Sequence, residues 1–302
     1  MSSERALRYF LTVVRTGSIR RAADQLYVAA SAISRQIADL EEHYGAPLLE
    51  RIPRGVVATE AGRVVLEHAL HLAQSEADLR ARLLRLQGAH EGVVRIICGS
   101  GWEADLMRNG LRAFAAAHPL VTWRVAIGPA RDILDSLFQG DADIGLLFDP
   151  PATEGLESLM VVPGKMHALL PVPEYAEVRG PKWLRELAHV PAAVHPEGYT
   201  LRHALSQIEA NERFRLHIQL ETESADLRFG FANAGLGMLI APVEISREYP
   251  GLREGRLAAV ELLDPQLRNA CAHLLVRAGR KLPEAVASLV EILSTRMAAF
   301  RR

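Results

Sequence analysis

A serine and an arginine on one face of a short helix are the residues of this sequence whose types and spacing point most directly to chemistry. Over residues 30–44 (ASAISRQIADLEEHY), Ile33, Ile37 and Leu40 recur at the spacing of a buried helical stripe. Ser34 and Arg35 project away from that stripe. Arginine can donate two hydrogen bonds to guanine O6 and N7, worth about 1–3 kcal/mol of discrimination, and serine can bond a base edge or a phosphate. The alternative is an ordinary surface helix with two solvated polar residues.

A second short helix precedes this one. Its apolar residues also recur at helical spacing, and Ser18 stands just ahead of it as an N-cap, after the turn residue Gly17. Gly45 can end the later helix in the left-handed conformation, and a proline at position 47 prevents it from continuing. Small Ala22 and Ala23 let the two helices cross closely. Residues 18–44 therefore predict a helix-turn-helix, whose second helix is sized for the major groove of DNA.

Two further elements extend this prediction. Residues 46–59 are expected to form a short hairpin, or wing, in which Arg51 and Arg54 can meet phosphate or the minor groove; the alternative is a solvated loop. Thr59 caps a helix over about residues 60–88, which at 1.5 Å per residue is about 40 Å long. A helix of this length needs a partner beyond one small domain. Its apolar residues approximate one stripe: Leu66, Leu70, Ala73, Ala77 and Leu84.

From residue 93 onward, apolar strand-like runs alternate with helical patterns, including a helix over residues 103–117. The order strand, helix, strand, helix, strand over residues 93–149 implies a parallel sheet with helices on both faces. A second unit of this kind follows, and the chain then returns with a strand and a last helix over residues 283–300. We predict two α/β lobes, the second inserted into the first, with crossovers near residues 162–166 and 267–270.

Residues 29–62 closely resemble the N-terminal domain of LysR-type transcriptional regulators. The matching segments are residues 32–37 (AISRQI), 40–41, 45, 47–49, 51, 54 and 59–62, and residues 20–23 (RRAA) with Leu26 match the family's preceding helix. Ala30 departs from the pattern, because many members carry a base-reading glutamine there. Leu48-Leu49 replaces the usual Leu-Phe, which changes packing more than contacts. The DNA-binding residues that the resemblance then implies are Ser31, Ser34, Arg35, Arg51, Arg54 and Arg20.

The resemblance also implies the architecture. Residues 1–59 would form an all-α winged helix-turn-helix and residues 60–89 a linker and dimerisation helix. Residues 90–302 would form an α/β effector domain of the two-lobed, periplasmic-binding-protein type II fold, with lobe 1 at about 90–163 and 269–302 and lobe 2 at about 164–268. Members usually assemble as homotetramers of two dimers on dyad-symmetric double-stranded DNA. A cytoplasmic location is implied, with RNA polymerase as a further partner.

A small effector between the lobes is the last implication. In open α/β sheets, ligands sit beyond the carboxyl ends of strands, where helix N-termini offer free N–H groups. Ser100 and Thr200 are expected to bond the effector; the alternative is that such residues are only N-caps and core. No anion clamp is evident, so a carboxylate, an aromatic and an amino-acid-like ligand all stay open. The expected effector-binding residues are Ser100, Gly101, Trp102, Gly128, Phe148, Tyr199, Thr200 and Glu223.

Composition excludes several other classes. The 302 residues are 49% hydrophobic, which suffices for a large core, and the net charge is −1, with a modest +2 over residues 1–58. Two cysteines, Cys98 and Cys271, are too few for a disulfide scaffold, and their apolar strands predict inert thiols. Neither a signal peptide nor a membrane-spanning run is evident in the sequence.

Motifs for catalysis, cofactors and metals are not evident either. Gly99-Ser100-Gly101 lacks the third glycine of a dinucleotide fingerprint, since residue 104 is alanine, and no acidic residue closes a following strand in the expected place. His68 and His71 have the spacing of metal ligands without a third ligand. We therefore expect a regulator that is not an enzyme and uses no cofactor or metal. The alternative is a small-molecule-binding α/β protein without DNA-binding function.

Overall fold

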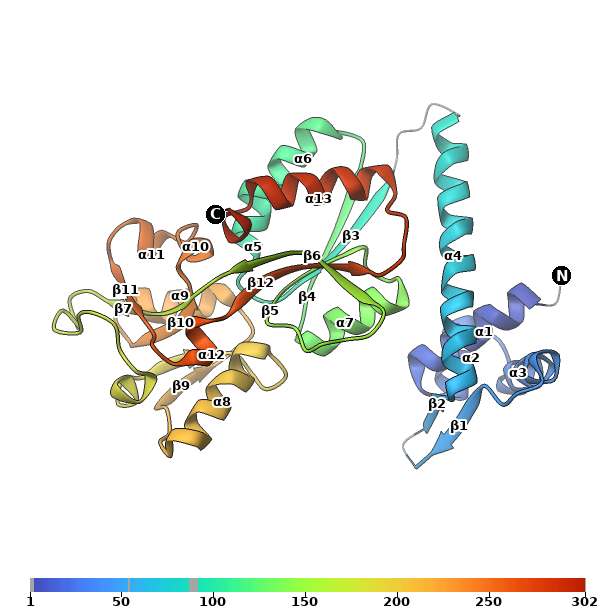
Figure 1. Cartoon of the computed structure of the whole chain (residues 1–302), viewed down its shortest axis with the longest axis horizontal. Coiled ribbons are helices and arrows are strands. Elements are labelled where there is room, and N and C mark those ends of the chain that lie inside the picture. The colour runs from blue at the N-terminus through green and yellow to red at the C-terminus, as the bar shows by residue number, and fades with distance from the viewer. Residues whose placement is uncertain (1–2, 54, 87–91, 302) are drawn as a thin grey trace. The chain divides into compact units, whose positions relative to one another are not determined.

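The structure is a computed structural model that describes the backbone of residues 3–53, 55–86 and 92–301. The chain divides into two compact units, residues 1–89 and residues 90–302, and each is described by itself. Figure 1 shows helices with a small hairpin in the first unit and two helix-covered sheets in the second. This is the predicted fold class: an all-α helix-turn-helix with a wing, followed by an α/β domain.

The first unit is built on a helix-turn-helix. Its elements are α1 (Ser3–Thr16), α2 (Ile19–Leu26), α3 (Ala30–Tyr44), β1 (Leu49–Ile52), β2 (Gly55–Ala58) and α4 (Glu60–Leu86). A small core joins the first three helices, since Val13 of α1 packs with Ala22 and Ala23 of α2 and with Ile33 and Ile37 of α3. The apolar stripes predicted for residues 18–44 therefore face one another, as a helix-turn-helix requires.

Helix α4 is long, and its described side chains include both buried and exposed apolar residues. Its 27 residues span about 40 Å at 1.5 Å per residue. Leu66 and Leu70 of the predicted stripe are buried within the unit, where α4 packs against α1. The side chains of the other three stripe residues, Ala73, Ala77 and Leu84, lie outside the described residues.

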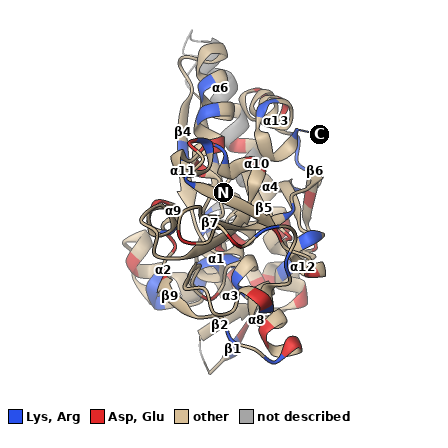
Figure 2. Ribbon diagram, turned by 90° about the vertical axis from the view of Figure 1, so that its left-hand side faces the viewer, with Lys and Arg blue, Asp and Glu red and all other residues tan. Residues whose placement is uncertain are grey.

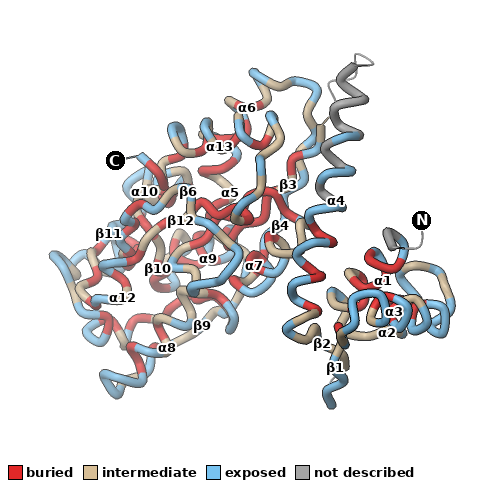
Figure 3. The backbone as a smooth tube through the Cα atoms, turned by 45° about the vertical axis from the view of Figure 1, so that its right-hand side comes forward, coloured by how far each residue is buried: buried red, intermediate tan, exposed pale blue. Residues whose placement is uncertain are grey.

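A second apolar stripe on α4 is exposed. Val64, Leu72 and Leu79 are 67%, 43% and 50% exposed. At 100° per residue these three side chains fall within about 80° of one another around the helix axis. Figure 3 shows exposed residues alternating with buried ones along the described part of α4. The helix thus offers an apolar face that its own unit does not cover.

Lobe 1 of the second unit is built on a five-stranded sheet. The order is β4–β3–β5–β12–β6, formed by β3 (Val93–Cys98), β4 (Thr122–Ile127), β5 (Ile144–Phe148), β6 (Leu156–Pro163) and β12 (Cys271–Arg277). The parallel arrangement predicted for residues 93–149 is confirmed for β3, β4 and β5. The late strand β12 lies between β5 and β6 and runs antiparallel to both. The sheet as a whole is therefore mixed.

Helices cover both faces of this sheet. The segment predicted as one helix consists of α5 (Glu103–Asp105), a π-helical stretch η1 (Leu106–Leu111) and α6 (Arg112–Ala117). It packs on one face with α13 (Glu284–Arg296) and η3 (Ala298–Phe300), while α7 (Ala130–Gln139) lies on the other face. The predicted element exists, but its middle is wound more loosely than a regular helix.

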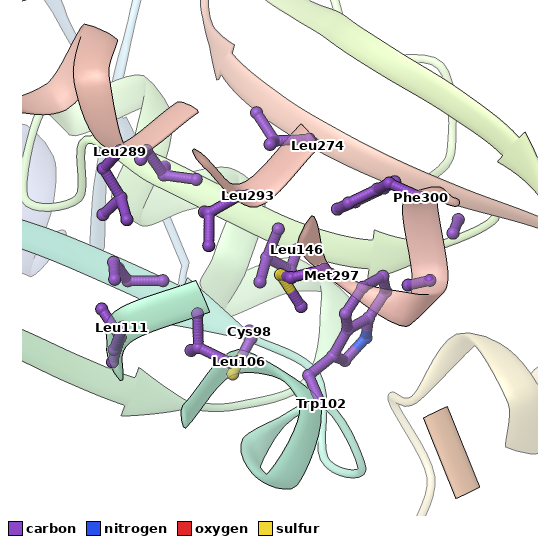
Figure 4. Close-up of a cluster of buried hydrophobic side chains, with 14 of the residues drawn as sticks. Cys98, Trp102, Leu106, Leu111, Leu146, Leu274, Leu289, Leu293, Met297 and Phe300 are labelled. Carbon is purple, nitrogen blue, oxygen red and sulfur yellow. The ribbon is translucent and has the colours of Figure 1, made fainter. Parts of the chain in front are cut away.

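The core of lobe 1 includes Met297, Ala299 and Phe300. Figure 4 shows Trp102 close to Phe300, and their ring centroids are 5.8 Å apart. The fully buried carboxylate of Asp105 accepts hydrogen bonds from the backbone N–H groups of Ala298 at 2.9 Å and Ala299 at 3.0 Å. These charge-assisted bonds fasten the end of the chain beside Trp102.

Lobe 2 is built on a second mixed sheet, in the order β11–β7–β10–β8–β9. Its strands are β7 (Met166–Pro171), β8 (Ala192–Val194), β9 (Ile218–Glu221), β10 (Met238–Pro242) and β11 (Leu257–Glu261). α8 (Thr200–Glu212) packs on one face and α9 (Ala225–Asn233) on the other. Shorter helices are η2 (Leu184–Leu187), α10 (Val243–Ser246), α11 (Pro250–Arg253) and α12 (Pro265–Arg268). The chain leaves lobe 1 after β6 and returns with β12, so lobe 2 is inserted into lobe 1.

Candidate functional site

The two helices of the helix-turn-helix are held by local capping bonds. The Ser18 side chain accepts a hydrogen bond from the Arg21 N–H at 3.4 Å, so Ser18 is the N-cap that the sequence predicted. Tyr27 ends α2 in the left-handed conformation, with φ 54°. Gly45 ends α3 in the same way, with φ 67°, as predicted. These caps fix both ends of α2 and the C-terminal end of α3, whereas the first residue of α3 follows Ala29, which makes no side-chain capping bond.

The outward face of α3 carries the polar residues. Ile33, Ile37 and Leu40 are buried, whereas Ser31, Ser34 and Arg35 are exposed. The Ser34 hydroxyl donates a hydrogen bond to the Ala30 carbonyl at 3.0 Å. Among the described residues, no acidic side chain forms an ion pair with Arg35. Arg20 on α2 is also exposed. Exposed serine and arginine side chains on one helix face are what base and phosphate contacts require, and Ser34 can turn its hydroxyl from the Ala30 carbonyl to such a partner.

The wing is tied firmly to the helices. β1 and β2 pair antiparallel from Leu49↔Ala58 to Ile52↔Gly55. The Glu41 carboxylate on α3 accepts hydrogen bonds from the Leu48 N–H at 2.7 Å and the Leu49 N–H at 3.2 Å. Arg51 on β1 is exposed, whereas Arg54 lies outside the described residues. The orientation of the wing relative to α3 is thus set by side-chain bonds as well as by the hairpin.

Thr59 joins the wing to α4. Its hydroxyl donates to the Pro47 carbonyl at 2.7 Å and accepts from the Gly62 N–H at 2.9 Å, which confirms the predicted N-cap. A Cβ on Gly62 would overlap the Leu48 carbonyl oxygen. Thr59 is therefore needed to cap α4, and Gly62 is needed because the backbone of α4 lies close to the Leu48 carbonyl.

A cavity lies between the two lobes of the second unit. Residues of both lobes line it, from Gly99 and Phe148 on one side to Thr200 and Ser246 on the other. Six of the eight residues expected at the effector site line it: Ser100, Gly101, Trp102, Phe148, Tyr199 and Thr200. Its walls are mostly apolar, and the rings of Trp102 and Phe148 stack at 4.8 Å. A second hollow, toward α8 and α12, shares Phe148, Tyr199 and Thr200 as part of its lining.

The polar side of the cavity is centred on Arg228, which the sequence did not single out. Arg228 is only 3% exposed, and its guanidinium donates to the Ser100 hydroxyl at 3.0 Å and to the Thr222 carbonyl at 2.9 Å. The Ser100 hydroxyl in turn donates to the Glu223 carbonyl. Because Ser100 belongs to lobe 1 and Arg228 to lobe 2, these bonds connect the lobes across the cavity.

Burial controls the protonation of this region. Loss of solvent lowers the pKa of Arg228 to about 10, an effect that the nearby Glu103 charge opposes, so the guanidinium stays charged at neutral pH. Burial, together with the Arg228 charge, lowers the pKa of His195 to about 3, so this imidazole is neutral. Burial and the Glu223 carboxylate raise the pKa of Tyr199 to about 12. The cavity therefore presents one positive charge and neutral donors.

Comparison with known proteins decides the family. Residues 5–63 match the model described as "Bacterial regulatory helix-turn-helix protein, lysR family", and residues 87–298 match the "LysR substrate binding domain". The chain belongs to the LysR family. As a LysR-family protein it is a DNA-binding transcriptional regulator with a substrate-binding domain, which confirms the family and function predicted from residues 29–62.

Individual relatives agree with this assignment. The "SDS degradation transcriptional activation protein" of Pseudomonas sp. (strain ATCC 19151) is 32% identical over 295 residues, which cover 96% of this chain and 94% of that protein. Full-length CbnR complexed with its target DNA shares the fold, with 21% identity, a TM-score of 0.54 and coverage of 96% and 98%. A full-length OxyR variant from Pseudomonas aeruginosa shares it with 16% identity, a TM-score of 0.67 and coverage of 98% and 96%.

Two expected effector residues of this LysR-family chain do not line the cavity. Gly128 follows the edge strand β4, and its N–H donates to the Cys98 carbonyl at 3.1 Å. Glu223 is exposed; it offers its backbone carbonyl to Ser100, and its carboxylate accepts from the Tyr199 hydroxyl at 3.4 Å. Both residues follow strands, as expected, and Glu223 contacts the cavity only through Ser100 and Tyr199, which line it.

The remaining candidate groups give no sign of redox or metal chemistry. Both cysteines are free thiols; burial raises the pKa of Cys98 to about 12 and raises that of Cys271 as well. Among the described residues, no group of three or more His, Cys, Asp or Glu side chains could hold a metal ion. Within the same residues, no helix is long and apolar enough to cross a membrane. Acidic and basic residues occur in both units, in keeping with the net charge of −1 (Figure 2).

Proposed function

We propose that α3 lies in the major groove and reads bases with Ser31, Ser34 and Arg35. Support comes from the exposure of these donors on the face opposite the buried stripe of Ile33 and Ile37. Arg51 on the wing and Arg20 on α2 contact the phosphate backbone or the minor groove, and Arg54 has the same role on sequence grounds alone. One observation carries the proposal: α3 buries its apolar side and exposes Ser31, Ser34 and Arg35 on the other.

We propose that a small effector binds in the cavity between the lobes. Support comes from the apolar walls and from the polar groups of Ser100, Thr200, Tyr199 and Arg228 that converge on it. The effector shifts the protein between shapes only if it binds one shape more tightly than another. Bonds that cross the cavity, such as Arg228 to Ser100, are where such a difference in binding would arise.

We propose that the regulator is a cytoplasmic homodimer that pairs into a homotetramer on a dyad-symmetric operator. Val64, Leu72 and Leu79 supply the apolar face through which α4 pairs with its copy. RNA polymerase would then be contacted by the assembled regulator. As a regulator whose cavity binds rather than converts its ligand, the protein is not an enzyme.

A footprint of the purified protein on the DNA upstream of its own gene tests the DNA proposal. The expected result is a protected stretch with dyad symmetry that weakens as salt is raised, because phosphate contacts release counterions. No protection there, and none in a genome-wide selection of fragments, would reject α3 as a DNA-reading helix. Thr200→Val tests the cavity, since it should reduce stabilisation of the protein by an identified effector while DNA binding persists. An unchanged thermal shift would remove Thr200 from the site.

A further inference from the structure

Arg228 is a buried cation without a direct ion-pair partner, and the nearby Glu103 charge only partly opposes the effect of burial on its pKa. Only 3% of the residue is exposed, and among the described residues no carboxylate forms an ion pair with it. Two of its nitrogens bond neutral groups, the Ser100 hydroxyl and the Thr222 carbonyl. Removing a charge from water without an opposite charge is costly, and the lowered pKa of Arg228 reflects that cost. An anion at this place would offset it.

The guanidinium also keeps an unused donor. Among the described residues, its buried Nε has no hydrogen-bond partner. Nε and Nη2 lie on the same edge of the guanidinium plane, and such an edge fits the two oxygens of one carboxylate. Nη2 is the nitrogen now bonded to the Ser100 hydroxyl. A carboxylate could therefore accept hydrogen bonds from both Nε and Nη2 if the Ser100 hydroxyl moved away from Nη2.

The remainder of the cavity fits an uncharged, apolar body. Trp102 and Phe148 stack on the lobe 1 side, and Phe229, Leu239 and Ile240 line the lobe 2 side. His195 is neutral, and no acidic residue is among the described lining residues. The charge that faces the ligand is then +1. A dianion would leave one negative charge in an apolar space, and a cation would meet Arg228 unfavourably.

We propose that the effector is a small monocarboxylate with an apolar body, whose carboxylate is held by the Nε–Nη2 edge of Arg228. This inference rests on the proposed effector site and names the class of ligand that it takes. The ligand's carboxylate replaces the Ser100 hydroxyl as the partner of Nη2. Because that hydroxyl also bonds the Glu223 carbonyl, the ligand rearranges the bonds between lobes at the point where it is recognised.

Calorimetric titration of the full-length protein tests the proposal. The probes are benzoate, phenylacetate and hexanoate, each compared with its own amide, which has nearly the same shape but no charge. At least one carboxylate is expected to bind once per chain and at least about tenfold more tightly than its amide, because hydrogen bonds to a charged group are stronger than those to a neutral one. If no carboxylate binds, or if each amide binds as well as its acid, the proposal is wrong.

Variants assign the effect to Arg228. Arg228→Gln should weaken carboxylate binding at least about tenfold and leave amide binding unchanged, and Arg228→Lys, which keeps the charge but loses the planar fork, should fall between. Arg131→Gln is the matched control, because Arg131 is an exposed arginine of α7 that does not line the cavity. Carboxylate binding that is undiminished in Arg228→Gln would overturn the proposal. If Arg228→Gln does not fold, titration of Arg228→Lys with the same acids and amides still tests the proposal, because only the acids should bind this variant more weakly.

The same preparations separate this inference from the proposed function. A footprint that responds to an amide but not to its acid would keep the regulator and its cavity while rejecting the anion. A missing footprint with intact carboxylate binding would reject the DNA proposal and keep the ligand class.

Discussion

Replacing Arg35 by alanine isolates one contact of the proposed DNA-reading surface. Arg35 is exposed, and among the described residues it forms no ion pair, so its loss should change the free energy of unfolding by less than about 0.5 kcal/mol. If α3 lies in the groove, the variant loses a two-bond contact with guanine worth about 1–3 kcal/mol at each half-site. This corresponds to about a 5- to 150-fold higher Kd for one half-site, and a dimer on two half-sites loses it twice.

Fluorescence anisotropy on the footprinted operator, at three salt concentrations, measures this loss. Arg131→Ala removes the same charge from the other unit and should leave the Kd unchanged. A guanine-to-adenine change at the contacted base should cost the native protein affinity but cost Arg35→Ala little more. Unchanged DNA affinity in a folded Arg35→Ala protein would refute the placement of α3 in the groove.

Three more perturbations follow from the structure. Gly62→Ala should lower the free energy of unfolding, measured by denaturant titration, by about 1–3 kcal/mol, because its Cβ would displace the Leu48 carbonyl. The same displacement should weaken DNA binding. Gly92→Ala is the control, because a Cβ at Gly92 would meet no atom within 4 Å and should change neither quantity. Leu72→Glu with Leu79→Glu should give monomers in light scattering if the exposed face of α4 joins two copies. His195 has a pKa of about 3 in the folded protein against 6.5 for a free imidazole, so protonation favours the unfolded state. The free energy of unfolding should therefore fall as pH drops below 6.5, by up to about 1.4 kcal/mol per pH unit. Unfolding measured at several pH values should show a smaller fall in His195→Gln.

The helix-turn-helix could be predicted because its signals are local. Ser18, Gly45 and Thr59 each act within a few residues of themselves, and the structure confirms all three caps. The outward face of α3 follows from the spacing of Ile33, Ile37 and Leu40, which are all buried. Periodicity and capping decide such elements before any distant contact forms.

The polar side of the cavity could not be predicted in the same way. Arg228 follows the N-cap Ser224 in the helical sequence ADLRFGF, where an arginine is usually a solvated residue. Its burial depends on contact with Ser100, 128 residues earlier in the chain. The weak signal that could have found it is its position in the first turn of a helix between Leu227 and Phe229. Gly128 follows a strand as predicted, but its distance from the lining residues depends on β4 being the edge strand of its sheet, which local sequence does not reveal.

The insertion of lobe 2 into lobe 1 has a consequence for biosynthesis. All strands of lobe 2 lie within residues 166–261 and its core extends to Ala270, so this lobe can fold once residue 270 has left the ribosome. Lobe 1 must wait, because β12 occupies an interior place in its sheet and Asp105 binds the N–H groups of Ala298 and Ala299. A nascent chain that has already completed its DNA-binding unit therefore holds an unfinished sensor until residues 298 and 299 have been made. A chain stopped before residue 298 would contain the helix-turn-helix but would lack the two backbone donors that Asp105 binds.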